Sequence, residues 1–332
     1  MLNFCTLFDS FYLSRGLVMY ESLKKQLNNF HLYIFAFDQL CYDILKSFKL
    51  DKVTIINLKD FENNDLLAVK DKRTKAEYCW TCTPSTIHYV IENFKVPNCT
   101  YIDADLYFYQ SPEDLIAELR LTNKNVLITE HRYNKIAKIR DEKRAGRFCV
   151  QFITFTNEPE SIEVLEEWKN QCISWCFARY EDNKFGDQKY LDEWPEKYKN
   201  VHILKHLGGG VAPWNVNQYQ FEISNESIIG NEKRTQKKFP LVFFHYHFVR
   251  FMDKETIDLG WNYLSKFVVR NLYKPYVFEI LKLEELLESI NPYYKRKYFN
   301  NNNVGFKEFI KRIIKKISKF NIIKVKANNG IY

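Results

Sequence analysis

The stretch TYIDADLYF, residues 100–108, places two carboxylates inside an otherwise apolar run. Acidic residues are depleted from strands, and a buried carboxylate without a partner is costly. In an extended strand end, residues two apart point to the same side, so we expect Asp103 and Asp105 to aim at one point. A divalent cation would offset their repulsion, and oxygen ligands suit magnesium or manganese. The alternative is a solvated turn in which Asp105 caps the next segment.

The elements that must position these acids follow from the periodicity of the first half of the chain. Short apolar runs predict strands over residues 2–7, 31–37, 53–58, 100–102, 126–129 and 150–155. Amphipathic runs predict helices over 14–27, 39–48, 75–94 with a break or kink at Pro84, and 159–177.

This alternation predicts an α/β fold with a mostly parallel sheet flanked by helices. Ligands of such folds bind beyond the carboxyl ends of the strands. Asp9, Asp38 and Asp103 each follow an apolar strand and are expected at that edge. The second half is less regular, and from about residue 258 a helical pattern runs to the end with a polar interruption at 300–303. We expect one α/β domain over 1–257 and a helical, basic C-terminal extension over 258–332.

Composition excludes several classes of protein. The chain has 332 residues, of which 46% are hydrophobic and 17% aromatic, enough for a substantial core. It has no apolar stretch of the roughly 20 residues that a membrane span needs, and its start lacks the basic region of a signal peptide. Eight scattered cysteines are typical of reduced thiols in a cytosolic protein. Cys79 and Cys82 have the spacing of a redox or metal pair, but no second pair lies at a fitting distance, so we expect core residues.

Four motifs together resemble those of the GT-A fold glycosyltransferases. They are TLFDSFY after the first strand, YIDADLYF, the later GDQKYL and a histidine pair in FHYHFVRF. The likeness is to the family-eight-like bacterial sugar transferases and covers residues 1–250. It implies a Rossmann-like GT-A catalytic domain that binds a nucleotide-diphosphate sugar and manganese, and a reaction with retention of configuration.

The resemblance also implies roles for single residues. Asp103 and Asp105 match the metal-binding acids, with Asp105 binding the ion directly and Asp103 also contacting the ribose. His245 matches the third metal ligand, an imidazole that suits manganese better than magnesium. Because residues alternate along a strand, we expect only one of His245 and His247 to face the metal, and His245 is preferred.

On the donor side, the resemblance assigns the loop after the first strand to the base. Thr6 and Leu7 would line the base through backbone groups, Asp9 would accept its imide hydrogen, and Tyr12 (or Phe11) would stack on it. Asp187 and Gln188 match the sugar-contacting pair, in which Asp187 holds donor hydroxyls and the carbonyl of Gln188 steadies an oxocarbenium-like sugar.

The chain departs from the family after the histidine pair. The family has a glycine and a Lys-Pro-Trp there, whereas this chain continues as HYHFVRF. Arg250 is expected to take over the contact to the diphosphate, because a guanidinium binds phosphate oxygens bidentately. Trp214 and Asn215 lie in an APWN turn that follows three glycines. We expect this turn to line the binding site of a sugar. The alternative for Trp214 is a core residue.

The positive charge of the chain is concentrated near its C-terminus. The net charge is +8, and residues 307–326 hold eight Lys or Arg and one Glu. Apolar residues at three- and four-residue spacing between them predict a basic amphipathic helix lying on an anionic membrane surface. A helix packed on the domain or joining a dimer is the alternative, and no motif points to nucleic acid.

The combined prediction is a metal-dependent transferase that moves a sugar, by default from a UDP-sugar, to a glycan or glycolipid acceptor. Bacterial surface polysaccharide or lipooligosaccharide synthesis on the inner face of the cytoplasmic membrane is the expected setting. The alternatives are a nucleotidyltransferase that makes nucleotide sugars and a catalytically silent membrane-docking protein of the same fold.

Overall fold

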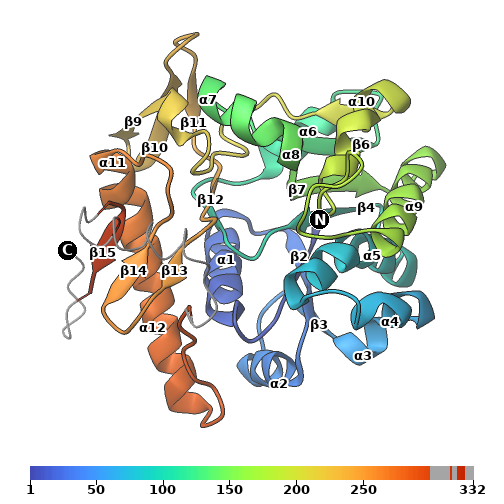
Figure 1. Ribbon diagram of the computed structural model, residues 1–332, viewed down its shortest axis with the longest axis horizontal. Coiled ribbons are helices and arrows are strands. Elements are labelled where there is room, and N and C mark those ends of the chain that lie inside the picture. The colour runs from blue at the N-terminus through green and yellow to red at the C-terminus, as the bar shows by residue number, and fades with distance from the viewer. Residues whose placement is uncertain (300–314, 316–319, 326–332) are drawn as a thin grey trace.

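The computed structural model describes residues 1–299, 315 and 320–325, and its centre is a seven-stranded sheet (Figure 1). In spatial order the strands are β3 (Val53–Asn57), β2 (Phe30–Ala36), β1 (Leu2–Phe8), β4 (Asn98–Ile102), β7 (Phe148–Thr156), β6 (Val126–Glu130) and β8 (Val201–Ile203). β7 is antiparallel to both of its neighbours, and every other adjacent pair is parallel. The α/β class and the mostly parallel sheet are therefore confirmed.

Helices cover both faces of this sheet. On one face lie α1 (Leu13–Gln26), α2 (Gln39–Phe48) and α6 (Glu113–Arg120), and on the other lie α3 (Leu58–Phe61), α4 (Asn64–Lys70), α5 (Lys75–Phe94) and α9 (Pro159–Ser174). Side chains of β1 alternate between the two cores, with Phe4 in the first and Cys5 in the second, as the two-residue period of a strand requires. α5 continues through Pro84, so the expected break is absent.

The second half of the chain adds three small sheets. They are β9 (Tyr219–Ser224) with β10 (Ser227–Glu232) and β11 (Lys238–Pro240), then β5 (Leu106–Phe108) with β12 (Phe243–His245), and β13 (Arg250–Phe251) with β14 (Thr256–Asp258) and β15 (Ile322–Lys324). Short helical segments are α7 (Lys135–Ala137), α8 (Lys143–Ala145), α10 (Trp194–Lys197), α11 (Lys266–Val268), the π-helices Lys138–Glu142 and Val269–Tyr273, and the 3₁₀ turns Lys189–Glu193 and Val216–Gln218.

The region after residue 258 is helical in part. The long helix α12 (Lys274–Ile290) is present, but Ile322–Lys324 forms a strand that pairs with Thr256–Asp258. The expectation of helix to the end is wrong at this point, and β14 spans the expected boundary between 257 and 258. Most of the basic segment 307–326 lies outside the described residues. Among the described residues, no helix combines the length and apolarity needed to cross a membrane.

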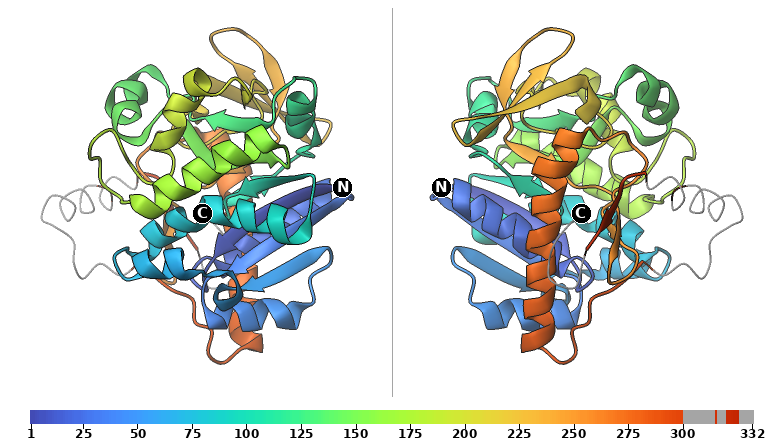
Figure 2. Two further views of the ribbon diagram at one scale, coloured as in Figure 1. Left: turned by 90° about the vertical axis from the view of Figure 1, so that its right-hand side faces the viewer. Right: turned by 90° about the vertical axis from the view of Figure 1, so that its left-hand side faces the viewer.

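α12 packs against α1 (Figure 2). The carboxylate of Glu284, which is only 3% exposed, accepts hydrogen bonds from Ser14 Oγ at 2.5 Å and from the Tyr294 hydroxyl at 3.1 Å. Val18 of α1 lies in one apolar cluster with Tyr276 and Val277 of α12. The C-terminal region therefore shares buried surface with the first helix of the α/β part.

Candidate active site

A tight turn brings the two acids together at the carboxyl end of β4. Asp103 and Asp105 lie between β4 and β5, and the turn closes through a hydrogen bond from Leu106 N to Asp103 O at 3.2 Å. The two side chains are 29% and 11% exposed. The turn, and not an extended strand, thus sets the direction of the two carboxylate side chains. Their low exposure argues against a solvated surface turn.

β12 and the turn after it place the two histidines beside these acids. It is antiparallel to β5, with His245 opposite Leu106. His245 Nε2 lies 3.0 Å from Asp105 Oδ1 and 3.7 Å from Asp103 Oδ2. Tyr246 N donates to Asp105 O at 2.9 Å, which fixes the register of this strand against the turn.

Both histidines face the same point. Ligand atoms of Asp105, His245 and His247 lie within 4.8 Å of one another, the one such group of three among the described residues. We expected only one of the two histidines on this side, but both lie there, with His247 in the turn that follows β12. Asp103 lies beside this group through its contact with His245 and is not a member of it.

The charged groups of this site shift one another's pKa values, because they lie close together and are largely shielded from water. Burial and the charge of Asp105 raise the pKa of Asp103 to about 6, against an opposing effect of His245. Burial acts to raise the pKa of Asp105 as well, but the imidazolium of His245 outweighs it and lowers that pKa to about 2. Burial and the charge of His245 lower the pKa of His247 to about 4, so His247 is neutral and has a lone pair for a ligand.

Trp214 and Asn215 stand behind the histidines. The indole ring meets the rings of His245 and His247 edge-on, with centroids 5.3 and 5.7 Å away. Trp214 Nε1 and Asn215 Nδ2 both donate to His131 O, and Asn215 Oδ1 accepts from Ala212 N. Asn215 has no exposed surface, so its expected contact to a substrate would require this turn to open.

The turn after β1 lies on the same edge of the sheet. Asp9 Oδ1 accepts from the backbone N–H of Phe11 and Tyr12, and Asp38 holds the turn from β2 by accepting from Ser10 N at 2.9 Å. Tyr12 is 39% exposed. Thr6 and Leu7 are buried in β1, beyond the point where its register with β4 ends at Cys5.

Three cations surround this turn. Arg15 is 5% exposed and donates to Phe11 O and, at 3.0 Å, to Val249 O, which ties the turn to the loop after His247. Lys297 Nζ donates to Ser10 Oγ at 3.0 Å. Arg250 lies over the ring of Phe299, 4.3 Å from its centroid, and its charge acts to lower the pKa of Tyr12 in this turn. Within the described part of the chain, no ion pair joins any of the three to a carboxylate.

Asp187 and Gln188 follow Gly186 and lead into the 3₁₀ turn Lys189–Glu193. Asp187 is 6% exposed, and burial together with the charge of Asp103 raises its pKa to about 7. That charge effect places Asp187 near the acids of the β4–β5 turn. Gln188 Nε2 donates to Ala145 O, which leaves the side-chain carbonyl to face another partner.

Sequence reasoning missed Arg15, Lys297 and Gln151. Gln151 Oε1 lies 2.7 Å from His245 Nδ1. Its signal in the sequence is a polar amide in the middle of the apolar strand FCVQFITF. Arg15 and Lys297 carry no comparable signal, because a cation in a helix or loop is ordinarily a surface residue.

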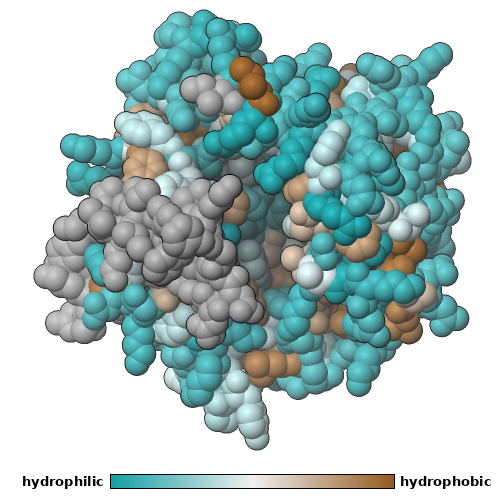
Figure 3. All heavy atoms as spheres, in the orientation of Figure 1, coloured by the Kyte–Doolittle hydropathy of each residue, from teal (hydrophilic) through white to brown (hydrophobic). Residues whose placement is uncertain are grey.

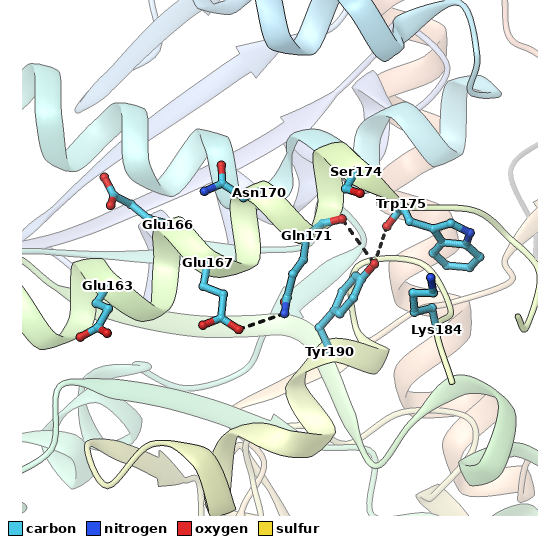
Figure 4. Close-up of a pocket in the computed structure, with 9 residues that line it drawn as sticks. All are labelled: Glu163, Glu166, Glu167, Asn170, Gln171, Ser174, Trp175, Lys184 and Tyr190. Carbon is cyan, nitrogen blue, oxygen red and sulfur yellow. Dashed lines mark hydrogen bonds between the residues drawn. The ribbon is translucent and has the colours of Figure 1, made fainter. Parts of the chain in front are cut away.

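In Figure 3 the surface is recessed near the centre of the visible face. In Figure 2, β1 runs from the N-terminus toward this same face. A separate pocket of about 600 Å³ lies along α9 (Figure 4). It is lined by Glu163, Glu166, Glu167, Asn170, Gln171, Ser174, Trp175, Lys184 and Tyr190. None of the candidate residues described above lines it.

Comparison with curated proteins finds two bacterial relatives. The chain is 28% identical to the uncharacterized protein YfnD of Bacillus subtilis (strain 168) over 295 residues, 87% of this chain and 92% of YfnD. It is 27% identical to the uncharacterized protein YfnF of the same strain over 260 residues, 76% of this chain and 84% of YfnF. No family model matches the chain.

Solved structures that resemble the chain are glycosyltransferases. GlyE of Streptococcus pneumoniae TIGR4 has 12% identity and a TM-score of 0.49, covering 92% of this chain and 66% of that one. The galactosyltransferase LgtC, in complex with donor and acceptor sugar analogs, has 11% identity and a TM-score of 0.47, covering 74% and 87%. Mouse xyloside xylosyltransferase 1 has 13% and 0.42, covering 61% and 84%. At these values the likeness by itself assigns no activity to this chain.

Proposed function

We propose that the protein is a metal-dependent glycosyltransferase that moves a sugar from a nucleotide-diphosphate sugar to an acceptor hydroxyl. The observation that carries the proposal is the group of Asp105, His245 and His247 at the carboxyl edge of the sheet. Arg15 joins the loop of this group to the turn after β1, so a cation and a nucleotide would be held on one side of the molecule.

The donor set fits a cation of the manganese type. One carboxylate and two imidazoles combine hard oxygen with borderline nitrogen, a mixture that suits manganese better than magnesium. Asp103 lies close enough to share the site. When bound here, the cation would neutralise the charge that develops on the departing diphosphate.

The residues around the turn after β1 supply the nucleotide contacts in this proposal. Asp9 Oδ1 is occupied by two backbone N–H groups, and no hydrogen bond from a described residue reaches Oδ2, which is left for the imide of a uracil. Tyr12 offers a partly exposed ring to stack on the base. Arg250, which is partly exposed, and Lys297 would contact phosphate oxygens.

Asp187 and Gln188 would act on the sugar. Because Gln188 donates its amide N–H to Ala145 O, its carbonyl oxygen is oriented and electron-rich, which suits an oxocarbenium-like sugar. Asp187 would bind hydroxyl groups of the donor sugar. Trp214 would line the site on the far side of the histidines, against whose rings it packs. Retention of configuration, a UDP-sugar donor and a glycan or glycolipid acceptor of the bacterial surface complete the proposal and rest on the resemblance of the motifs. Docking of the basic C-terminal segment on an anionic inner membrane surface is part of it.

The test is release of nucleoside diphosphate from a panel of nucleotide sugars, with manganese, with magnesium and with EDTA. We expect metal-dependent hydrolysis of one donor. Asp105→Asn should lower the rate at least about 100-fold, because it removes a ligand of the cation. Glu222→Gln, which removes an exposed carboxylate paired with Lys238, is the matched control and should leave the rate unchanged.

Three results would count against the proposal. Full metal-dependent turnover by Asp105→Asn would end the assignment of the metal site. A folded protein that hydrolyses no donor on the panel and binds no nucleotide would favour a silent docking protein. Formation of a nucleotide sugar from a sugar phosphate would instead identify a nucleotidyltransferase.

A further inference from the structure

Gln151 is a buried amide that the proposed chemistry does not use. It lies in the middle of β7 with no exposed surface, among apolar neighbours that fill the core. Its Nε2 has no hydrogen-bond partner among the described residues. A buried amide N–H without a partner is destabilising. This unpaired amide group lies next to His245, a proposed ligand of the cation.

The other end of the amide meets His245. Gln151 Oε1 and His245 Nδ1 are 2.7 Å apart, and the thiol of Cys149, two residues earlier on the same side of β7, also contacts this imidazole. The opposite ring nitrogen, Nε2, is the one that faces Asp105 at 3.0 Å. Gln151 of β7 thus contacts the Nδ1 side of the imidazole, whereas the Nε2 side faces the acids.

The surrounding backbone is built around this amide. Gln151 O accepts from Asp103 N at 3.1 Å, so β7 also sets the start of the β4–β5 turn. Gly210, at φ +94°, passes close by, and a Cβ there would come within 3.3 Å of Gln151 Nε2 and 2.8 Å of Thr129 Cγ2. The absence of a side chain at 210 leaves the amide the room it occupies.

We propose that Gln151 positions His245 as the nitrogen ligand of the cation by accepting the Nδ1 hydrogen on its carbonyl oxygen. With the Nδ1 hydrogen engaged by Gln151, the hydrogen that His245 gives up when a cation binds is the one on Nε2, the atom that faces Asp105. The reverse orientation of the amide would donate to Nδ1, place the ring hydrogen on Nε2 and remove the ligand. This inference rests on the metal site of the proposed function.

The experiment measures manganese affinity directly, by electron paramagnetic resonance of the free ion or by calorimetry, without a sugar donor. Gln151→Met keeps the length of the side chain and loses the acceptor, so its Kd should rise about 10- to 100-fold. Gln151→Glu keeps an acceptor oxygen and should stay within about threefold of the wild type. Thr154→Val is the matched control, because it removes a buried side-chain hydrogen bond from the same strand, to Thr100 at 2.9 Å, away from His245.

The outcomes separate this inference from the function on which it rests. Unchanged affinity in Gln151→Met, equal loss in Gln151→Met and Gln151→Glu, or equal loss in Thr154→Val would each overturn the positioning role while the metal site stands. A wild-type protein that binds no manganese would overturn the metal site itself. Weak binding by Gln151→Met with recovery in Gln151→Glu supports the inference.

Discussion

Asp187 is a buried acid whose proton links the candidate site to pH. Burial and the charge of Asp103 raise its pKa to about 7, whereas an unfolded aspartate has a pKa of about 3.9. The folded state therefore binds this proton more tightly than the unfolded state. The stability it contributes is fully present below about pH 4 and is lost as the pH rises to about 7.

Asp187→Asn should accordingly stabilise the metal-free protein in a pH-dependent way. The amide stays neutral, so we expect the free energy of unfolding to exceed that of the wild type by roughly 1–4 kcal/mol at pH 8 and by at most about 1 kcal/mol near pH 4.5. Urea unfolding in EDTA at both pH values measures this difference. Asp182→Asn, an exposed acid of the same segment, should change little at either pH. An equal gain from Asp187→Asn at both values would refute the buried-charge argument.

At the scale of single residues, the sequence predicted the groups whose chemistry is local. Asp103 and Asp105 interrupt an apolar run, and the histidine pair follows another, so both are visible in the sequence alone. Gln151 is visible in the sequence as an amide within an apolar strand. Its role, like those of Arg15 and Lys297, is recognised only through contacts with residues 94, 234 and 287 positions away, respectively. No spacing rule covers such distances, because they depend on how the finished sheet brings strands together.

The elements of the first half were predictable because each is long enough to show a period. Helix Gln39–Phe48 has the expected bounds, and β1 and β2 differ from expectation by one or two residues. The reversed direction of β7 was not predicted, since direction depends on pairing. Strands such as β12 and β13, with three and two residues, are too short for any periodic signal.

The helix α12 supports the histidine loop as well as the fold. Tyr246, between the two histidines, stacks on Tyr276 of α12 with ring centroids 3.7 Å apart and planes at 11°. Tyr276→Ala should lower the free energy of unfolding by about 3–5 kcal/mol and also weaken manganese binding, because the loop loses its backing. Thermal unfolding and manganese titration measure the two effects.

Leu287→Ala is the matched control on the same helix. Leu287 is buried in the other cluster, with residues of α1 and α2, so its loss should cost a comparable 2–5 kcal/mol and leave manganese affinity unchanged. Equal loss of affinity in both variants would mean that α12 affects the site only through global stability. The boundary between 257 and 258 stays a prediction.

At the scale of the whole molecule, the distribution of charge is uneven. The net charge of +8 is almost matched by the excess of positive charge in residues 307–326, so the rest of the chain is close to neutral. Each Lys or Arg near an anionic bilayer contributes about 1 kcal/mol to binding. A segment of this charge with interleaved isoleucine and phenylalanine is typical of helices that lie on a membrane surface, and docking there stays a prediction for this chain.

Replacing five of these cations by glutamine should therefore lower partitioning onto phosphatidylserine-containing vesicles at least about tenfold, with little effect on neutral vesicles. The five are Lys307, Lys311, Arg312, Lys316 and Lys319. Lys315 is kept, because it is buried and bonded to Asp258 and Gly260 O. Co-sedimentation at two salt concentrations measures the change, which should shrink at high salt.

The matched control changes the same net charge elsewhere. Lys46, Lys59, Lys95, Lys199 and Lys237 are exposed residues outside the segment, and their replacement by glutamine should leave vesicle binding within about twofold. Manganese affinity should be unchanged in the control variant, because none of its five exposed lysines belongs to the candidate site. If the two variants lose vesicle binding equally, attraction is a property of overall charge and the C-terminal segment is no docking element. If neither loses it, the membrane proposal fails and a packing or dimer role for the segment takes its place.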